Sequence, residues 1–251
     1  MEKLALLIFK KIFSFLFKFE NLKKLIQLLL KEDMMADRYD ELLYEASLTE
    51  KVPFSVLKAF VKTTTNTNPF FIETTKHLWA DVLLTYRSKF ENLYLAHTVN
   101  TKLNFIKPTE TELTSLYATT YGLMKVPYYK LVFEFDYTVN PFTLITDVSE
   151  NLKQGCSLLK KYKDFFPHAP EDIAWGLAAV SYFSEPIKIM KIVDRVKRTN
   201  LQESLSHEAP YLKAIRKDFG KAADKYEEIF SGVIQLSKKY KKQEVAFLMS
   251  N

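Results

Sequence analysis

Residues 52–69, VPFSVLKAFVKTTTNTNP, decide how the rest of the chain is interpreted. Val52-Pro53 forms a break, and the apolar residues after it have helical spacing, so we expect a helix to begin near Phe54 with Ser55 as a polar capping candidate. Three consecutive threonines follow, and threonine is a poor interior residue for a helix because its branched Cβ loses rotamer freedom. Asn68-Pro69 favours a turn, so the helix is expected to end there.

Composition predicts a predominantly α protein. The 251 residues are 47% hydrophobic, which is enough for one large domain or for one domain with appended helices. Only 5 glycines stand against 20 phenylalanines and 14 tyrosines, and alternating Val or Ile patterns are few. This balance favours long helices with aromatic packing over an all-β fold.

Residues that hold metals, phosphates or cofactors are scarce in this sequence. The single cysteine, Cys156, excludes a disulfide framework and a cysteine-based zinc site. The four histidines lack the spacing of a metal site, and the sequence contains no glycine-rich phosphate loop. We therefore expect no metal and no cofactor, and kinase, NTPase and dinucleotide-binding functions are disfavoured.

The formal charge of +6 would suit an anionic partner such as nucleic acid, anionic lipid or a bacterial wall polymer. However, 30 acidic residues are spread among 36 basic ones, and no dense basic run with interleaved aromatic residues is present. We therefore expect an ordinary solvated surface with a basic bias, and no nucleic-acid partner.

Residues 1–36 form a separate segment that predicts a basic amphipathic helix. Its lysines recur on one stripe, and its longest uncharged runs have six residues, far fewer than the roughly twenty that a membrane span needs. No small-residue cleavage site follows, so a cleavable signal peptide is not expected. Three interpretations fit the pattern: residues 3–19 contact an anionic membrane, dock into a groove on a partner, or pack on their own domain.

Further elements flank the opening stretch. YDELLYEAS, from Tyr39, predicts a helix with Leu42, Leu43 and Ala46 facing inward. A turn is expected at Tyr121-Gly122. Two short helices are then expected at about 147–165 and 170–182.

In order and spacing, these segments resemble the catalytic domain of soluble lytic transglycosylases, relatives of goose-type lysozyme that cleave peptidoglycan glycan strands. The opening stretch is similar to the helix that carries the family's catalytic glutamate. Four further segments resemble family motifs in the family's order: YDELLYEAS, GLMKVP at 122–127, residues 147–159, and WGLAAVSYF at 175–183. The resemblance implies a lysozyme-like fold over 37–185, with a cleft for peptidoglycan.

The cleft positions implied by the resemblance are degenerate. Thr64 stands where the family has its catalytic glutamate, and Thr65 stands where a serine follows it. Lys125 replaces the glutamine of the GLMQ motif and would either neutralise an acidic partner or be an ordinary exposed lysine. The positions that this comparison assigns to the cleft are Thr64, Thr65, Gly122, Leu123, Met124, Lys125, Val180 and Ser181, of which the last two replace a tyrosine and an asparagine.

The loss of the glutamate predicts a pseudoenzyme. Glycosidic bond cleavage needs a carboxylic acid with a raised pKa to protonate the leaving oxygen, and a threonine hydroxyl is not acidic enough for this role. Without general acid–base catalysis, a rate falls by on the order of a hundred- to ten-thousand-fold. Glu73 and Glu134 are candidate displaced acids, although each is more simply explained as a surface carboxylate.

Two segments extend the family pattern. Residues 70–118 are a long insertion, expected to be helical, that would cap the cleft or offer a new binding face. Residues 186–251 form an amphipathic C-terminal extension whose apolar seam runs from Leu212 to Ile234, with Gly220 and Gly232 as weak points. It is expected to pack on its own domain or on a copy of itself. Five tyrosines would line a sugar groove or belong to the core: Tyr117, Tyr121, Tyr128, Tyr129 and Tyr182.

Three functions are consistent with these observations. The first is a catalytically degenerate lytic transglycosylase-like protein with a structural, wall-docking or assembly role in an envelope-spanning machine or a phage particle. Such a protein would be located in the bacterial cell envelope or the virion, and would associate with proteins or with itself through its terminal helices. The second is an active peptidoglycan lytic transglycosylase with a displaced carboxylate. The third is an unrelated helical adaptor.

Overall fold

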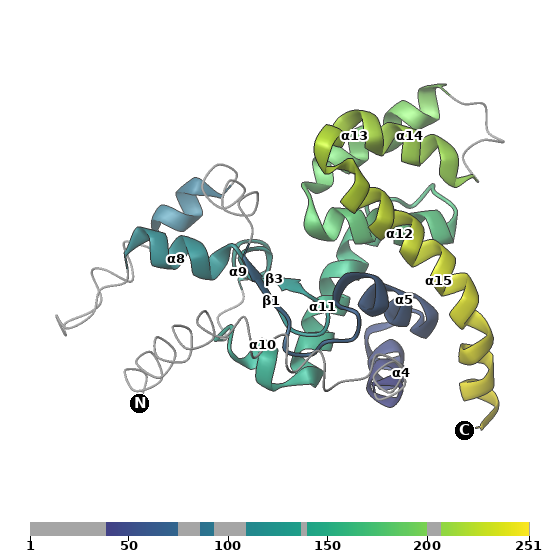
Figure 1. The fold of residues 1–251 in the computed structure, drawn as a ribbon, viewed down its shortest axis with the longest axis horizontal. Helices are drawn as coiled ribbons and strands as arrows, with labels where there is room; N and C mark the ends of the chain where they lie inside the picture. Colours follow the sequence, from purple (N-terminus) through teal and green to yellow (C-terminus); the bar gives the residue numbers. More distant parts are fainter. Residues whose placement is uncertain (1–38, 75–85, 93–108, 137–139, 200–206, 251) are drawn as a thin grey trace. The chain divides into compact units, whose positions relative to one another are not determined.

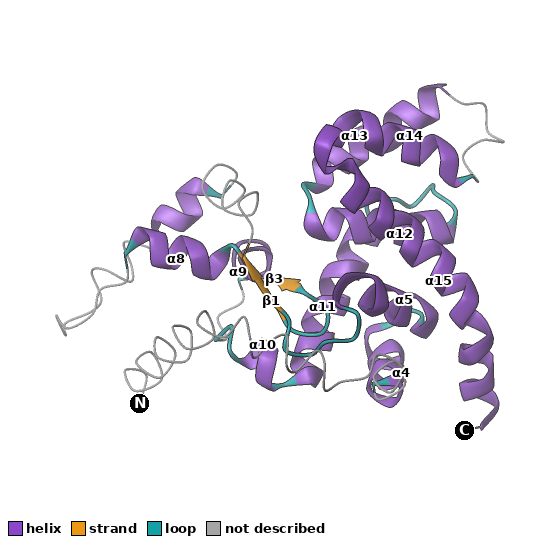
Figure 2. Cartoon of the chain, in the orientation of Figure 1, coloured by secondary structure: helices purple, strands orange, loops and turns teal. Residues whose placement is uncertain are grey.

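The computed structural model describes residues 39–74, 86–92, 109–136, 140–199 and 207–250, and these are mainly helical, as the composition predicts (Figures 1 and 2). The chain divides into two compact units, Met1–Glu41 and Leu42–Asn251, and the elements from α5 to α15 belong to the second. The predicted N-terminal helix at 1–36, including the proposed membrane-contacting residues 3–19, lies outside the described residues. Among the described helices, none combines the length and apolar character needed to cross a membrane.

The N-terminal elements of the second unit follow the predicted pattern. The helices and strands up to α9 are α4 (Asp40–Glu50), α5 (Phe54–Thr65), β1 (Ile72–Thr74), α8 (Glu110–Tyr117), β2 (Thr119–Tyr121), β3 (Val126–Pro127) and α9 (Tyr128–Phe135). In α4, Leu43 is fully buried while Leu42 and Ala46 are half-buried, so the predicted inward face is confirmed for Leu43 and only partly for the other two.

Helix α5 is the centre of the core. Phe54, Leu57, Phe60 and Val61 are fully buried on it, because their helical spacing brings them to one face. Pro53 is the N-cap and no side chain caps the helix, so the expectation that Ser55 caps it is wrong; Ser55 is itself buried within the first turn.

A small antiparallel sheet follows α5. Its strands lie in the order β1-β2-β3, with Ile72 opposite Tyr121 and Tyr121 opposite Val126. β1 falls inside the insertion at 70–118 that was expected to be helical, and this part of the prediction is wrong because the residues after α5 pair with β2 instead. Within the same insertion, residues 87–92 and α8 are helical as predicted, and 75–85 and 93–108 lie outside the described residues.

The remaining helices complete the fold. They are α10 (Thr143–Thr146), α11 (Val148–Lys163), α12 (Glu171–Phe183), α13 (Pro186–Thr199), α14 (Glu208–Phe219), the 3₁₀ turn η3 (Gly220–Ala222) and α15 (Ala223–Ser250). The helices predicted at 147–165 and 170–182 are thus confirmed as α11 and α12. Asp147 caps α11 by accepting the Glu150 backbone N–H at 3.0 Å.

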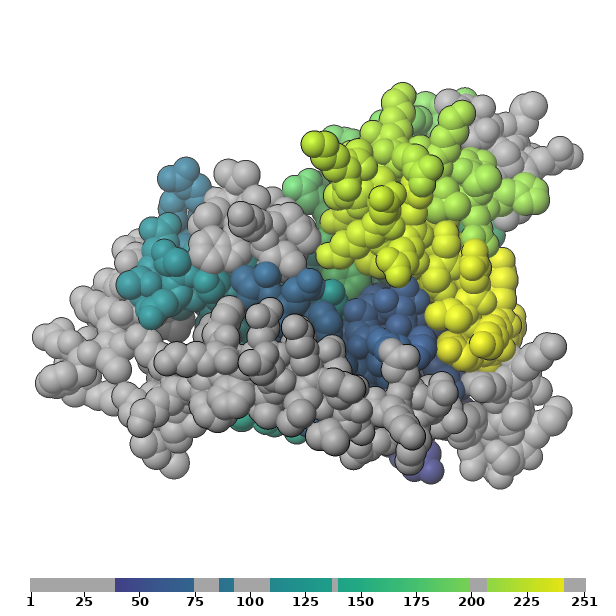
Figure 3. Space-filling model, in the orientation of Figure 1, coloured from purple at the N-terminus to yellow at the C-terminus, as the bar shows by residue number. Residues whose placement is uncertain are grey.

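The C-terminal extension packs on its own domain. α15 lies along α5 and α12, and Figures 1 and 3 show this last helix beside the α5 segment. Of the predicted apolar seam, Ile215, Tyr226, Ile229 and Ile234 are buried, whereas Ala222 is exposed and this part of the prediction is wrong. Phe230 and Val233 of α15, which the predicted seam did not include, are also buried. The residues after 185 therefore contribute to the hydrophobic core of the predicted domain at 37–185.

Candidate functional site

The last turn of α5 brings Thr64 and Thr65 to the edge of the sheet. The helix ends after Thr65 because Asn66 and Thr67 both adopt left-handed backbone conformations, with φ of 50° and 63°. The Thr64 hydroxyl donates to the Phe60 carbonyl oxygen at 2.8 Å, so it is held against the helix backbone. The Thr65 hydroxyl lies 3.0 Å from the Val61 carbonyl oxygen and 2.8 Å from that of Leu123, and thereby links α5 to the turn between β2 and β3.

That turn, residues 122–125, is held by Asn151 of α11. The Asn151 Oδ1 accepts the Met124 backbone N–H at 2.8 Å, and its Nδ2 donates to the carbonyl oxygens of Tyr121 and Leu144, each at 2.9 Å. Gly122 has φ of +74°, and a Cβ there would collide with the Asn151 amide and the Leu144 carbonyl oxygen, so glycine is required. The turn residues Leu123 and Met124 are buried, and the predicted turn at Tyr121-Gly122 is confirmed.

Lys125 ends this turn as a buried residue, so the expectation of an ordinary exposed lysine is wrong. Its Nζ lies 2.5 Å from Glu73 Oε2 on β1 and 4.5 Å from the centre of the Phe71 ring. A buried ammonium group is costly unless it is paired, and the β1–β2 pairing supplies Glu73 as its partner.

Thr64 and Lys125 line a pocket of about 170 Å³, whose lining residues are Thr63, Thr64, Lys125, Phe183, Lys225, Glu228 and Ile229. They come from α5, the β2–β3 turn, α12 and α15. The C-terminal helix thus contributes nearly half of the lining.

Lys225 is the lysine of this pocket whose pKa is lowered. Burial lowers its pKa, the nearby positive charge of Lys125 lowers it further, and the Glu73 carboxylate partly opposes both effects. Among the described residues, no carboxylate lies within ion-pair distance of its ammonium group. The pocket therefore holds a lysine whose charged form lacks a close counter-charge.

Val180 and Ser181 lie away from this pocket. Both are fully buried in α12, and it is Phe183, two residues after Ser181, that reaches the pocket. The Ser181 carbonyl oxygen accepts a hydrogen bond from Lys130 Nζ at 2.7 Å. The structure therefore brings together Thr64 and Lys125, places Thr65 and Gly122–Met124 as their support, and separates Val180 and Ser181.

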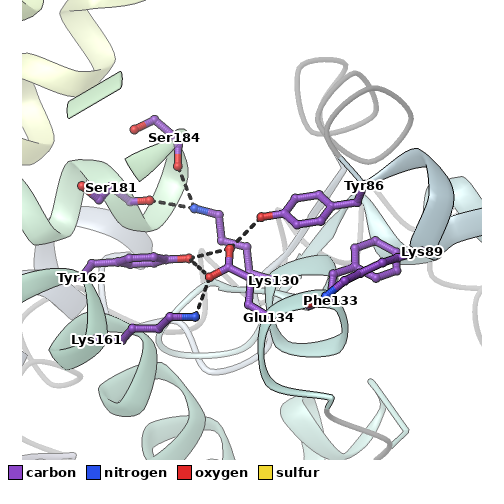
Figure 4. Close-up of polar contacts among 9 residues, drawn as sticks. All are labelled: Tyr86, Lys89, Lys130, Phe133, Glu134, Lys161, Tyr162, Ser181 and Ser184. Atoms are coloured by element: carbon purple, nitrogen blue, oxygen red, sulfur yellow. Dashed lines mark hydrogen bonds and ion pairs between the residues drawn. The ribbon is translucent and has the colours of Figure 1, made fainter. Parts of the chain in front are cut away.

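Glu134 belongs to a second, buried polar cluster, which Figure 4 shows. Its carboxylate accepts hydrogen bonds from the hydroxyls of Tyr86 (2.7 Å) and Tyr162 (3.1 Å), and it pairs with Lys161 Nζ at 2.9 Å. Burial alone would raise the pKa of Glu134, but the Lys130 charge, the Tyr86 hydroxyl and Lys161 together hold it below its ordinary value. Glu134 is thus a half-buried, ionised hub, and it is not among the residues that line the pocket beside Thr64.

Lys130 joins this cluster to α12. It is 1% exposed, and its Nζ donates to the carbonyl oxygens of Ser181 and Ser184, each at 2.7 Å, at the C-terminal end of α12 (Figure 4). A cation is favourable there because the helix dipole places partial negative charge at that end.

The tyrosines considered for a sugar groove are core residues. Their exposed fractions are between 0% and 6% for Tyr117, Tyr121, Tyr128, Tyr129 and Tyr182. They pack on one another, as in the stacked rings of Tyr117 and Tyr128 at 5.6 Å. The core interpretation is confirmed for all five.

Sequence reasoning missed the residues that α15 contributes to the pocket. Lys225 and Glu228 flank the apolar seam at Tyr226 and Ile229, and this seam was the available signal. Polar residues beside a buried seam lie at the edge of the covered face, where pockets between helices open. The segment that this seam would pack against could not be identified from spacing alone.

Chemically, the pocket can bind a small polar or charged group. Glu228 is the only carboxylate among its described lining residues, and it is exposed to solvent. Glu73 is not among the lining residues, but its carboxylate is paired with Lys125, which lines the pocket. Compared with known proteins, the chain matches no family model, no curated protein and no solved structure.

Proposed function

We propose that this chain is a catalytically degenerate relative of lytic transglycosylase domains, with a structural or wall-docking role in a bacterial envelope machine or a phage particle. The observation that carries the proposal is the environment of Thr64. This residue lines a pocket at the end of α5, where the resemblance would place the catalytic glutamate. Its hydroxyl is bonded to the helix backbone.

Neither Glu73 nor Glu228 has the environment that a general acid usually has. A general acid must be protonated near neutral pH, which requires burial away from positive charge. Glu73 lies 2.5 Å from a lysine ammonium group, and Glu228 is exposed. A pocket without such an acid is better suited to binding a ligand than to cleaving a glycosidic bond.

The contacts around the pocket support retention of a shaped site. The Thr65 hydroxyl joins α5 to the β2–β3 turn, and three hydrogen bonds of Asn151 connect that turn, β2 and α10. Buried polar networks whose groups are all hydrogen-bonded hold one conformation, so these contacts support a turn with a defined shape. An assembly role is supported by exposed apolar side chains on α13, where Ile187 and Met190 are 66% and 41% exposed.

The test is digestion of purified peptidoglycan, with released fragments resolved by mass, beside a pull-down of intact wall. We expect wall binding without anhydro-sugar products from the unmodified protein. Thr64→Glu restores a carboxyl group at the end of α5, and Thr64→Gln is the matched control with the same size and no acidic proton. Anhydro-sugar products from the unmodified protein would overturn the proposal, and absence of wall binding would remove its docking role.

One observation favours the second candidate function, an active lytic transglycosylase with a displaced carboxylate. Glu228 lines the same pocket as Thr64. If the unmodified protein releases products, Glu228→Gln should abolish them while leaving the fold intact. Activity that survives this substitution would exclude Glu228 as the acid.

A further inference from the structure

One lysine in the pocket beside Thr64 lacks a close counter-charge. Lys125 is matched by Glu73 at 2.5 Å, whereas among the described residues no carboxylate lies within ion-pair distance of Lys225. Glu228 also lines the pocket and is exposed to solvent. An anion placed beside Lys225 would therefore supply the close counter-charge that this lysine lacks.

The neutral lining groups are compatible with an anion. Phe183 and Ile229 provide apolar walls, and ion pairs are stronger where water is partly excluded. A volume of about 170 Å³ admits a group of a few heavy atoms and excludes a large ligand from full entry.

We infer that this pocket is a subsite for an oxyanion, a carboxylate or phosphate group presented on a larger molecule, bound by Lys225 with Lys125 behind it. As an account of wall docking, the inference rests on the proposed function, since wall polymers carry both kinds of group. As an anion subsite, it rests on the geometry of the pocket alone.

The pKa of Lys225 can be used to detect an anion bound in the pocket. Its pKa is lowered by burial and by Lys125, and a bound anion would favour the charged form and raise that pKa. Ligand binding and lysine protonation are therefore coupled, and each can be used to measure the other.

The experiment titrates the full chain, with ¹³C-labelled lysine, by NMR of the lysine Cε signals at constant ionic strength. The probes are N-acetylmuramic acid, which carries a carboxylate, N-acetylglucosamine as the matched neutral sugar, and inorganic phosphate. We expect the Lys225 titration midpoint to rise with at least one of the two anions and not with the neutral sugar. Response to only one anion identifies the source of the oxyanion.

Variants test the assignment to Lys225. Lys225→Gln should weaken anion binding by about tenfold to a hundredfold, as expected for loss of a charge-assisted hydrogen bond. Lys239→Gln, on an exposed position of the same helix, should leave it unchanged. If Lys225→Gln does not fold, competitive amine labelling of the unmodified protein replaces it, and bound anion should protect Lys225.

Two results would overturn the inference: no shift of the Lys225 midpoint with either anion, or equal anion binding by Lys225→Gln. Wall pull-down separates this failure from failure of the proposed function. A protein that binds wall equally well with and without Lys225 keeps the function and loses the subsite. A protein that binds the anion at Lys225 but not wall keeps the subsite and loses the function.

Discussion

Lys125 and Glu134 are charged residues whose environments differ from what their sequence neighbours suggest. Lys125 follows a glycine turn and Glu134 sits in an amphipathic helix, both of which commonly carry solvated charges. In the structure, Lys125 is buried against Glu73, and Glu134 is 13% exposed and surrounded by two hydroxyls and two lysines. Except for Lys130, which is on the same helix as Glu134, each partner lies far away in the sequence, so local pattern could not reveal the pairing.

Glu134 should make the stability of the protein depend on pH. Its pKa is lower in the folded protein than its ordinary value of 4.5, so its contribution is fully present above that value and is lost as pH falls through the folded pKa. Replacing it by Gln should cost about 2 kcal/mol of unfolding free energy near pH 7, because its buried lysine and tyrosine partners lose a charged acceptor.

Urea unfolding at a series of pH values measures this contribution. The difference between the unmodified protein and Glu134→Gln should be constant above about pH 5 and should shrink below 4.5, where protonated glutamate resembles glutamine. Glu91→Gln, at an exposed residue, is the control and should give a small difference throughout. A Glu134→Gln difference that stays constant down to pH 3 would contradict the assignment.

At the scale of elements, sequence periodicity predicted the helices well and the strands poorly. α11 and α12 begin and end within two residues of their predicted bounds, and α5 begins at Phe54 and ends three residues before the predicted Asn68, because each has a clear apolar face and a turn-forming boundary. β1 has only three residues, too few to show alternation, and exists because β2 pairs with it across 44 intervening residues. The lining of the pocket was predicted only in part. Thr64 and Lys125 followed from motif order, whereas α15 reaches the pocket only through tertiary packing, which local sequence patterns do not reveal.

Gly232 marks the closest approach of α15 to α5. The sequence indicated a weak point in a helix, but a Cβ at this position would lie 2.8 Å from Thr63 Cγ2 and 2.9 Å from its Oγ1. Gly232→Ala should therefore destabilise the protein by about 1–3 kcal/mol through overpacking, although alanine favours helix.

A double-mutant cycle with Thr63→Ala tests this contact. Thr63→Ala removes both atoms in the way, so the double variant should be more stable than Gly232→Ala alone, as measured by urea unfolding. Gln235→Ala, at an exposed position of the same helix, controls for helix propensity and should change little. Strict additivity of the two substitutions would show that the helices do not meet at this point.

At the scale of the whole molecule, we expect the segment after residue 185 to be required for folding. Burial of each large apolar side chain contributes roughly 1.5–3 kcal/mol, and total stability is typically only about 5–15 kcal/mol. α15 alone supplies Ile229, Phe230, Val233 and Ile234 to the core. Removing α15 should therefore cancel most of the free energy of unfolding of the protein.

A chain ending at Glu185 should lack a cooperative urea transition and should bind a hydrophobic dye, because the face of α5 that α15 covers is uncovered. A chain ending at Lys241 keeps the described contacts of α15 with α5 and is the control, for which a cooperative transition is expected. A cooperative transition in the shorter chain, with native near-ultraviolet circular dichroism, would establish an autonomous domain.

The packing of α15 on α5 also has a consequence during protein synthesis. α5 leaves the ribosome before the helix that covers it, which follows more than 150 residues later. During that interval, Phe60 and its apolar neighbours on α5 lack part of their native cover, which is the condition in which nascent chains bind chaperones or aggregate. Translation speed and chaperone supply are therefore expected to affect the yield of this protein more than the stability of its finished fold would suggest.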